Sequence, residues 1–170
     1  MTERVTLLAV GDVHIVREQP ESTFAHTADR LRSADIVFAQ LEEMYSDKGL
    51  ISPGHGTHSP ASNIPALTYA GFNVVSLAGN HTLDWGVEAL LDTIERLRGV
   101  GMAVIGVGRN LAEARQPAIV DRKGTRVAFL AYGCVGPDSY EAQRDKPGYA
   151  PMKAWTHYQQ VDYQPGTLPR

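Results

Sequence analysis

The chain has 170 residues, of which 43% are hydrophobic and 21% charged, the composition of one ordinary folded domain. The formal net charge is -3 and lysine and arginine are scattered, which excludes a basic surface for nucleic acid. Cys134 is the only cysteine, so no internal disulfide can form, and its place after an apolar run predicts a buried thiol. The first apolar run, of about six residues, is too short for a signal peptide or a membrane span. We therefore expect a cytoplasmic protein without a membrane segment.

The first third of the chain alternates between strand-like and helix-like patterns. Residues 5–10 form a continuous apolar run, which predicts a buried strand. Apolar residues spaced i, i+4 and i+7 predict a short helix over 22–33. The run IVFAQL, residues 36–41, predicts a second strand. The polar, Gly- and Pro-rich residues 45–60 indicate a loop.

The same alternation continues through the middle of the chain. Asn63 and Gly71 are residue types that favour the start and the end of a helix. The predicted elements are a helix over 64–71, a strand over 72–78, a helix over 85–99, a strand over 102–107, and a hairpin of strands 118–121 and 126–132 around RKG. This order predicts an α/β fold: a mostly parallel sheet flanked by helices, with an antiparallel hairpin at one side.

The last 35 residues have a different character. They are rich in proline and glycine, and their aromatic residues show no period. We therefore predict one folded unit over residues 1–135 and an irregular tail over 136–170. Such long structureless segments are uncommon in compact domains. Either the tail wraps over the sheet, or the chain is the front part of something longer.

Polar residues follow three of the predicted strands directly. Ligands of open α/β sheets bind beyond the carboxyl ends of the strands, so these side chains are expected to converge. Each residue alone has an ordinary explanation as a turn, loop or surface residue. The three groups are Asp12 and His14, then Glu42 and Glu43, then Asn80, His81 and Asp84.

The donor atoms of this set are oxygen and nitrogen, without a thiolate. Such donors suit Mn²⁺, Mg²⁺, Fe²⁺ or Zn²⁺. A carboxylate between two ions can bridge them, and Glu42, which is central in the set, is the candidate bridge. The glycines before Asp12 and Asn80 allow the sharp turns that would aim these side chains at one point. The sequence thus predicts a site for divalent metal ions at one edge of the sheet.

Four separated segments resemble the CapA proteins, a family named for poly-γ-glutamate capsule synthesis and placed in the metallophosphatase-like (calcineurin-like phosphoesterase) superfamily. They are GDVHIVR, ADIVFAQLEE, GFNVVSLAGNHTLDWG and GVGRNLAEARQPAI. The resemblance extends over residues 5 to 133, in order, spacing and residue type. It implies a metallophosphatase-like fold, a soluble hydrolase and a two-metal site.

The chain departs from the family pattern at three positions and lacks two motifs. His14 stands where the family often has methionine, Gln40 where it usually has asparagine, and Gly79 where it has the first asparagine of NNH. His14 and Gly79 restore the GDxH and GNH forms of the wider phosphoesterases. The family's later HWG and GHHPH-like segments, which supply further histidines, do not occur here. We therefore expect the chain to correspond to the amino-terminal half of a CapA-like protein, with an incomplete metal site and an incomplete sandwich.

The resemblance also implies roles for the polar residues. Asp12 and His14 would hold one metal ion, Glu42 would bridge, and Asn80 would hold the second. His81 would be the catalytic imidazole. Asp84 would either orient His81 or cap the helix that starts at Trp85.

Three further residues are candidates for substrate binding. Arg17 would either meet an anionic substrate or be a solvated side chain. His55 and His58 lie in SPGHGTHSP, whose spacing fits no familiar metal site and which suits a substrate-facing or exposed loop.

The expected function is a metal-dependent reaction, hydrolysis or formation, at a phosphoester or glutamyl-amide bond. The partner would be a small molecule or a polyglutamate-like chain, and the sequence predicts no oligomeric state. The alternatives are a metal-binding or accessory module without turnover, and a truncated fragment that lacks the later ligands.

Overall fold

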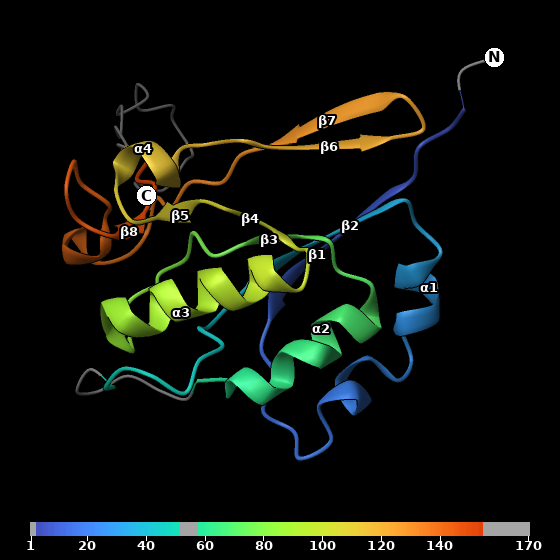
Figure 1. Ribbon diagram of the computed structural model, residues 1–170, viewed down its shortest axis with the longest axis horizontal. Helices are drawn as coiled ribbons and strands as arrows, with labels where there is room; N and C mark the ends of the chain where they lie inside the picture. Colours follow the sequence, from blue (N-terminus) through green and yellow to red (C-terminus); the bar gives the residue numbers. More distant parts are fainter. Residues whose placement is uncertain (1–2, 52–57, 155–170) are drawn as a thin grey trace, which may run out of the picture.

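A parallel sheet forms the centre of the molecule (Figure 1). The computed structural model describes residues 3–51 and 58–154. The four strands pair in the order β1–β2–β3–β4, and every pair is parallel because helical segments cross over between them. Their bounds are β1 (Leu7–Val13), β2 (Ile36–Leu41), β3 (Val74–Ser76) and β4 (Ala103–Ile105). The predicted α/β fold with a mostly parallel sheet is confirmed.

Helices cover one face of this sheet and a hairpin covers the other (Figure 1). Val37, Ala39 and Leu41 of β2 pack toward the helices in the larger hydrophobic cluster. Ile36 and Val74 belong to a smaller cluster on the hairpin side. The helices on one face are α1 (Ala28–Arg32), α2 (Ile64–Ala70) and α3 (Gly86–Gly99), and the hairpin is formed by β6 (Ala118–Arg122) and β7 (Thr125–Phe129). The short helix α4 (Leu111–Ala114) lies apart from these helices, next to the residues that follow β4.

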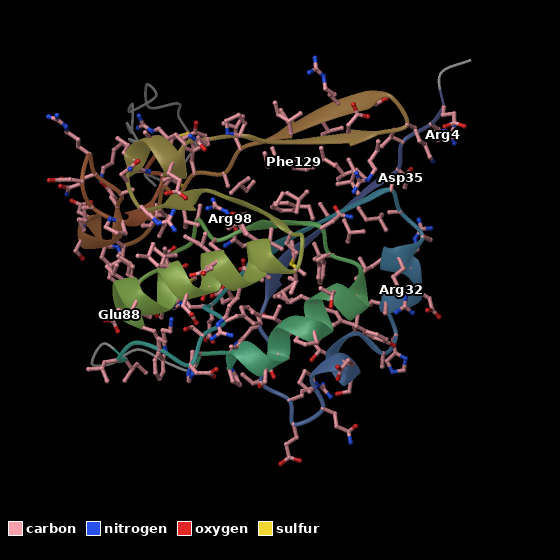
Figure 2. The ribbon with its side chains drawn as sticks, viewed as in Figure 1. Arg4, Arg32, Asp35, Glu88, Arg98 and Phe129 are labelled. Carbon is pink, nitrogen blue, oxygen red and sulfur yellow. The ribbon has the colours of Figure 1, made fainter. Side chains whose placement is uncertain are left out.

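The predicted hairpin is present, and its turn is the two-residue type that suits twisted strands. Lys123 and Gly124 connect β6 to β7 with positive φ angles of 52° and 72°. Phe129 points from the hairpin toward the sheet (Figure 2) and stacks on Phe38 of β2, with ring centroids 6.2 Å apart. At the tip, Lys123 Nζ lies 2.8 Å from Asp35 Oδ1. The hairpin is therefore attached to the start of β2 as well as to its middle.

The single helix predicted over 22–33 is wrong. The segment forms a 3₁₀ helix, η1 (Pro20–Phe24), and then the one-turn helix α1. Pro20 begins the first turn earlier than predicted, and the hydroxyl of Thr27 bonds to the carbonyl of Phe24 at 3.5 Å, a local bond that competes with helix continuation. The spacing of the apolar residues still indicates correctly which side chains face the core, because Phe24 and Leu31 are both buried.

Both ends of α2 match the prediction, but the predicted side-chain cap does not form. Gly71 ends the helix in the left-handed conformation, with φ of 92°. Asn63 does not cap the helix with its side chain, and a short 3₁₀ turn, η2 (Ala61–Asn63), precedes it. The side-chain amide of Asn63 instead donates to the carbonyl of Ile15 at 3.0 Å, and Ser59 Oγ donates to the same carbonyl at 2.8 Å. These bonds hold the segment that follows β1.

A buried carboxylate attaches the segment after β2 to α3. Asp92 accepts from Ser46 Oγ and from Arg96 Nε, both at 2.7 Å, and Lys48 Nζ lies 2.8 Å from it. Burial alone would raise the pKa of Asp92, but hydrogen bonds from Lys48, Ser46 and Arg96 outweigh burial and lower this pKa to about 2. The backbone N–H of Tyr45 also donates to Thr93 of α3 at 3.0 Å. The chain that leaves the candidate site is thus fixed to the longest helix.

The strand predicted over 102–107 is interrupted at Gly106. Its φ of 80° ends β4, and β5 (Val107–Gly108) turns away to pair antiparallel with β8 (Gly148–Tyr149). A Cβ at Gly106 would lie 2.6 Å from the Cβ of Ala78 and 2.9 Å from that of Ala131. Glycine is therefore required here both by backbone conformation and by space.

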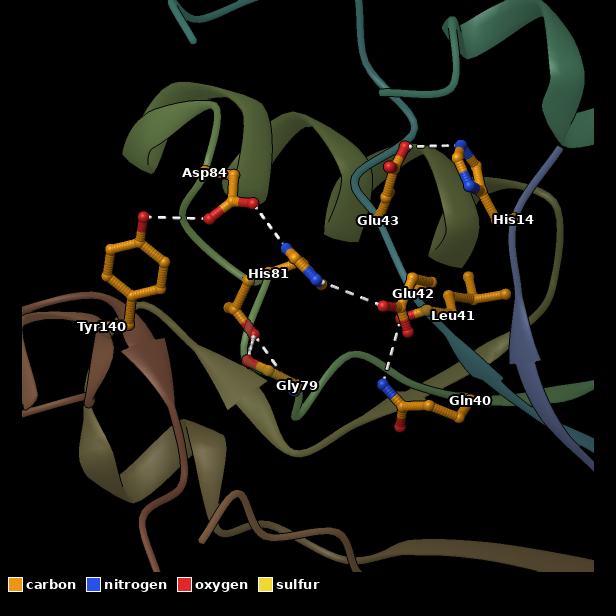
Figure 3. Close-up of polar contacts among 10 residues, drawn as sticks. His14, Gln40, Leu41, Glu42, Glu43, Gly79, His81, Asp84 and Tyr140 are labelled. Carbon is orange, nitrogen blue, oxygen red and sulfur yellow. Dashed lines mark hydrogen bonds and ion pairs between the residues drawn. The ribbon is translucent and has the colours of Figure 1, made fainter. Parts of the chain in front are cut away.

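The turn at Gly106 brings the later part of the chain against the end of the sheet. The backbone N–H of Ala150 donates to the carbonyl of Gly106 at 2.8 Å, and Tyr149 is buried. The 3₁₀ helix η3 (Asp138–Tyr140) belongs to this later part, and its Tyr140 lies beside Asp84, which follows β3 in the chain (Figure 3). The part of the predicted tail within the described residues is thus packed, while residues 155–170 lie outside the described part of the chain.

Two surface features complete the fold. Cys134 is exposed, so the predicted burial of its thiol is wrong: it lies beyond β7, where the chain has left the sheet. Among the described residues β1 pairs only with β2, so its other edge is open, and Leu7 is 41% exposed. No helix within residues 3–51 and 58–154 has the length and apolar character needed to cross a membrane.

Replacing Gly106 with alanine will lower the free energy of unfolding by roughly 2–5 kcal/mol, because left-handed strain adds to overpacking against Ala78. Gly124→Ala is the matched control, since φ is also positive there but no atom lies within 4 Å of a Cβ. Gly124→Ala will lower the free energy of unfolding only by the backbone strain, about 1–2 kcal/mol. Urea unfolding followed by circular dichroism measures both losses, and equal losses would contradict the argument from space.

Candidate functional site

The parallel register places the ends of β1 and β2 side by side. Asp12 pairs with Gln40, and Val13 with Leu41, after an irregularity at Gly11 that shifts the register by one residue. The N–H of Glu42 donates to the carbonyl of Val13 at 3.1 Å. Such a bulge re-aims the residues that follow it. As a result the carboxylates of Asp12 and Glu42 lie side by side, close enough for the charge of Asp12 to raise the pKa of Glu42.

A tight turn after β3 presents the third group of polar residues. The hydroxyl of Thr82, which is buried, donates to the carbonyls of Leu77 and Gly79 at 2.7 and 2.6 Å. Asn80 is exposed at the top of this turn, and a Cβ at Gly136 would come within 3.3 Å of its Cα. The hydrogen bonds of Thr82 therefore stabilise the turn from within, and the chain around Gly136 packs against its exposed side.

His81 connects two carboxylates that come from different elements (Figure 3). Its Nε2 atom lies 3.3 Å from Glu42 Oε1, and its Nδ1 atom lies 2.6 Å from Asp84 Oδ2. Asp84 is only 6% exposed, and its other oxygen, Oδ1, accepts a hydrogen bond from the hydroxyl of Tyr140 at 3.0 Å. The four side chains form one continuous polar chain, Tyr140–Asp84–His81–Glu42.

The alternative role of Asp84 as a helix cap is not observed. The helix α3 begins at Gly86, and Trp85, not Asp84, occupies the N-cap position. Both carboxylate oxygens of Asp84 are engaged instead with His81 and Tyr140. A buried carboxylate in these contacts is an orienting partner for the imidazole.

His14 faces a different carboxylate from the one that His81 faces. Its Nε2 atom lies 2.9 Å from Oε2 of Glu43, the second glutamate of the LEE segment (Figure 3). The sequence predicted that Glu43 lies at the strand end, but the role of metal ligand was assigned to Glu42 alone. Adjacent residues of an extended chain point to opposite sides, so the two glutamates serve two different histidines. Tyr140 was missed altogether, because it lies in a segment without any periodic signal.

The environment shifts the pKa values of the two histidines in opposite directions. The hydrogen bond to Asp84 raises the pKa of His81, with further increases from the charges of Asp84, Glu42 and Glu43. Burial lowers the pKa of His14, against the opposite influence of the charge of Glu42. Burial and the neighbouring charge of Asp12 raise the pKa of Glu42. The protonated form is thus favoured on His81 and disfavoured on His14.

The paired carboxylates bear directly on whether the site suits a metal ion. Two adjacent carboxylates repel each other unless a proton or a cation lies between them, and burial together with this repulsion raises the pKa of Glu42. Their oxygens, with the nearby imidazole of His14, are donors that divalent cations accept. Within residues 3–51 and 58–154, no group of three or more His, Cys, Asp and Glu side chains is arranged to hold a metal ion. The donor types therefore fit a cation, while the side chains in this conformation bond to one another.

The predicted substrate-binding residues lie apart from this chain of contacts. Arg17 is exposed, three residues beyond His14. The ring of His58 packs on Trp85, the neighbour of Asp84, with centroids 3.8 Å apart. His55 lies outside the described residues.

A cavity of about 690 Å³ lies beside β1 and reaches the site. Its walls are mainly apolar and come from β1, η1 and α1. The polar groups along it include Asp12 and His14 at the strand end, and His26 and Arg30 near α1. The cavity provides a hollow next to Asp12 and His14 in which a ligand could lie.

Comparison with known proteins identifies the family. Residues 6–166 match the family described as bacterial capsule synthesis protein PGA_cap, and the chain belongs to this family. The resemblance seen in the sequence is thereby confirmed.

Two of the similar proteins carry names that refer to capsule biosynthesis or to polyglutamine synthesis. The capsule biosynthesis protein CapA of Bacillus anthracis is 26% identical over 88% of this chain. A probable polyglutamine synthesis accessory protein of Mycobacterium tuberculosis is 39% identical over 51% of the chain, and an uncharacterized protein of Sinorhizobium fredii is 33% identical over 74%. The chain spans 40%, 24% and 30% of the length of these three relatives.

Replacing Asp84 with asparagine will lower the pKa of His81, because the carboxylate that raises it is removed. The folded-state pKa of His81 is raised above 6.5, so its contribution to the free energy of unfolding is complete below that pH and is lost as the pH rises through the raised pKa. The variant will lose this pH dependence. NMR titration of the His81 ring and urea unfolding at several pH values measure the two effects.

Asp121→Asn is the control for this experiment, since it removes the charge of an exposed aspartate on β6. It will leave the titration of His81 unchanged. An equal shift in both variants would show that general charge, and not the contact with Asp84, sets the pKa.

Proposed function

We propose that the protein is a metal-dependent enzyme of the capsule synthesis family that acts on a phosphoester or glutamyl-amide bond. The observation that carries the proposal is the polar chain Asp84–His81–Glu42, which ends at the contact between Glu42 and Asp12. An oriented imidazole next to paired carboxylates is an arrangement that acid–base catalysis at a cation site requires.

The metal ligands in this proposal are the side chains at the strand ends. Asp12 and Glu42 would supply carboxylate oxygens, and Glu42 would lie between two ions. His14 would supply a ring nitrogen and Asn80 an amide oxygen. A bound divalent cation would neutralise the negative charge that develops on the oxygens of the group under attack. The low pKa of His14 supports its assignment, because a ligand imidazole must be neutral.

His81 has the geometry of a proton donor. Its Nδ1–H donates to Asp84, which leaves Nε2 directed at Glu42 and toward the contact with Asp12. The raised pKa of His81 supports a role in which Nε2 holds a proton and delivers it to the departing oxygen or nitrogen. The raised pKa of Glu42 means that its charged form is disfavoured in these surroundings. A nearby cation would therefore stabilise this carboxylate.

The proposed substrate class rests on the relatives. The names of the Bacillus anthracis and Mycobacterium tuberculosis proteins refer to capsule biosynthesis and to polyglutamine synthesis. We infer a glutamyl-amide bond as one substrate class from these names, and a phosphoester as the other, because a reaction at either bond requires charge neutralisation at oxygen. The cavity beside β1 is the proposed location of the substrate.

Replacing Glu42 with glutamine will weaken Mn²⁺ binding by roughly tenfold or more, because loss of even a supporting partner of a ligand has an effect of this size. Isothermal titration calorimetry of the 170-residue chain gives the affinity. Glu88→Gln, at an exposed residue of α3, is the matched control and will bind as the unmodified chain does. Equal affinity of both variants would exclude Glu42 as a ligand.

The protein, supplied with Mn²⁺, will turn over an aryl phosphate or a γ-glutamyl anilide. His81→Asn will lower kcat by about 10²–10⁴, the usual contribution of a general acid, with little change in Mn²⁺ affinity. Glu88→Gln again serves as the control. Mn²⁺ binding without turnover of either substrate would contradict the enzyme proposal and favour a metal-binding accessory protein.

A further inference from the structure

The hydroxyl of Tyr140 reaches the candidate site from a part of the chain that is distant in sequence. It donates to Asp84 Oδ1 at 3.0 Å, across a separation of 56 residues. The other oxygen of the same carboxylate, Oδ2, faces His81 Nδ1 at 2.6 Å. Asp84 thus stands between a phenol and an imidazole and contacts both (Figure 3).

The short helix η3, which carries Tyr140, is held in place on both sides. Lys153 Nζ lies 2.7 Å from Asp138 Oδ1 and also bonds to Glu141, and these two acids flank the turn. The N–H of Ala142 donates to the carbonyl of Tyr149 at 2.8 Å. Such restraint on a three-residue turn fixes the position of the Tyr140 ring.

The packing behind η3 is equally close. A Cβ at Gly148 would lie 2.2 Å from the carbonyl oxygen of Tyr140, so a side chain there would displace the turn. Tyr140 is itself partly buried and packs against the larger hydrophobic cluster. The hydroxyl therefore cannot move far from Asp84 without breaking several contacts.

A donor at the second oxygen restrains the carboxylate of Asp84. Without the hydroxyl, the carboxylate would lose one of the bonds that resist its rotation about the Cβ–Cγ bond, and such a rotation would carry the imidazole with it. With both oxygens engaged, rotation would cost a hydrogen bond at a buried group, about 1–3 kcal/mol. The plane of the His81 ring is thereby tied to the position of Tyr140.

We propose that Tyr140 is a positioning residue that acts through Asp84 to hold His81 in its orientation toward Glu42. The expected effect of Tyr140 on turnover rests on the proposed function. Its effect on the orientation of His81 does not. The segment 138–153 is then a component of the site, in addition to the three strand ends.

The structural part is tested without turnover, by the NMR signal of the His81 Nδ1 proton. Tyr140→Phe keeps the ring and removes the hydroxyl, and the signal will shift and broaden as the proton exchanges faster with water. Tyr69→Phe is the matched control, because Tyr69 is exposed on α2 beside Arg32 and will leave the signal unchanged. An unchanged signal in Tyr140→Phe would overturn the proposal whether or not the protein is an enzyme.

Lys153→Met provides a second variant that leaves the hydroxyl in place. It removes both ion pairs that hold η3, and the His81 Nδ1 signal will broaden, to a smaller degree than in Tyr140→Phe. If Tyr140→Phe failed to fold, as judged by circular dichroism, a signal unaffected in Lys153→Met would count against the proposal.

The effect on turnover is tested by a double-mutant cycle. Tyr140→Phe will lower kcat about tenfold with KM unchanged, within the range found for groups that orient a ligand or a catalytic imidazole. Asp84→Asn will have the larger effect, and the double variant will be no slower than Asp84→Asn alone, because Tyr140 acts only through Asp84. Additive losses would overturn the proposal, and a changed NMR signal without any turnover would contradict only the enzymatic function.

Discussion

The contact between Asp12 and Glu42 depends on the parallel pairing of β1 and β2, and the rest of the site is arranged around it. Parallel strands end at the same edge of a sheet, so residues that follow different strands become neighbours. The irregularity at Gly11 places Asp12 opposite Gln40, two residues before Glu42. The pairing of β3 with β2 then brings the turn that carries His81 to the same edge. A slip of one residue in either pair would separate these side chains.

The strand ends could be predicted from the sequence because the signal is local. An apolar run that ends in a carboxylate or an imidazole predicts both the strand and the position of the polar residue. The contribution of Tyr140 could not be predicted in this way, since it depends on the turn at Gly106 and on the pairing of β5 with β8. The helix predicted over 22–33 failed for a related reason: spacing of apolar residues reports which side chains are buried, and does not report whether the backbone between them stays helical.

The two histidines of the site lie in different electrostatic surroundings although both face a glutamate. His81 also contacts the buried carboxylate of Asp84, which raises the pKa of His81. Burial has the larger influence on His14, and it lowers the pKa of this residue. Environments that separate the pKa values of like residues allow one to carry a proton while the other stays neutral. This separation supports a proton-delivering role for His81 and a ligand role for His14 in the proposed enzyme.

The open edge of β1 has a consequence for the behaviour of the chain in solution. An unpaired, apolar strand edge is a template for pairing with another chain, and concentrated samples of this polypeptide are therefore expected to self-associate along residues 7–10. The strand that would associate in this way is the one that carries Asp12. Substitutions intended to improve solubility belong at outward-facing positions near its start, such as Leu7, where a lysine would repel a second strand while leaving Asp12 in place.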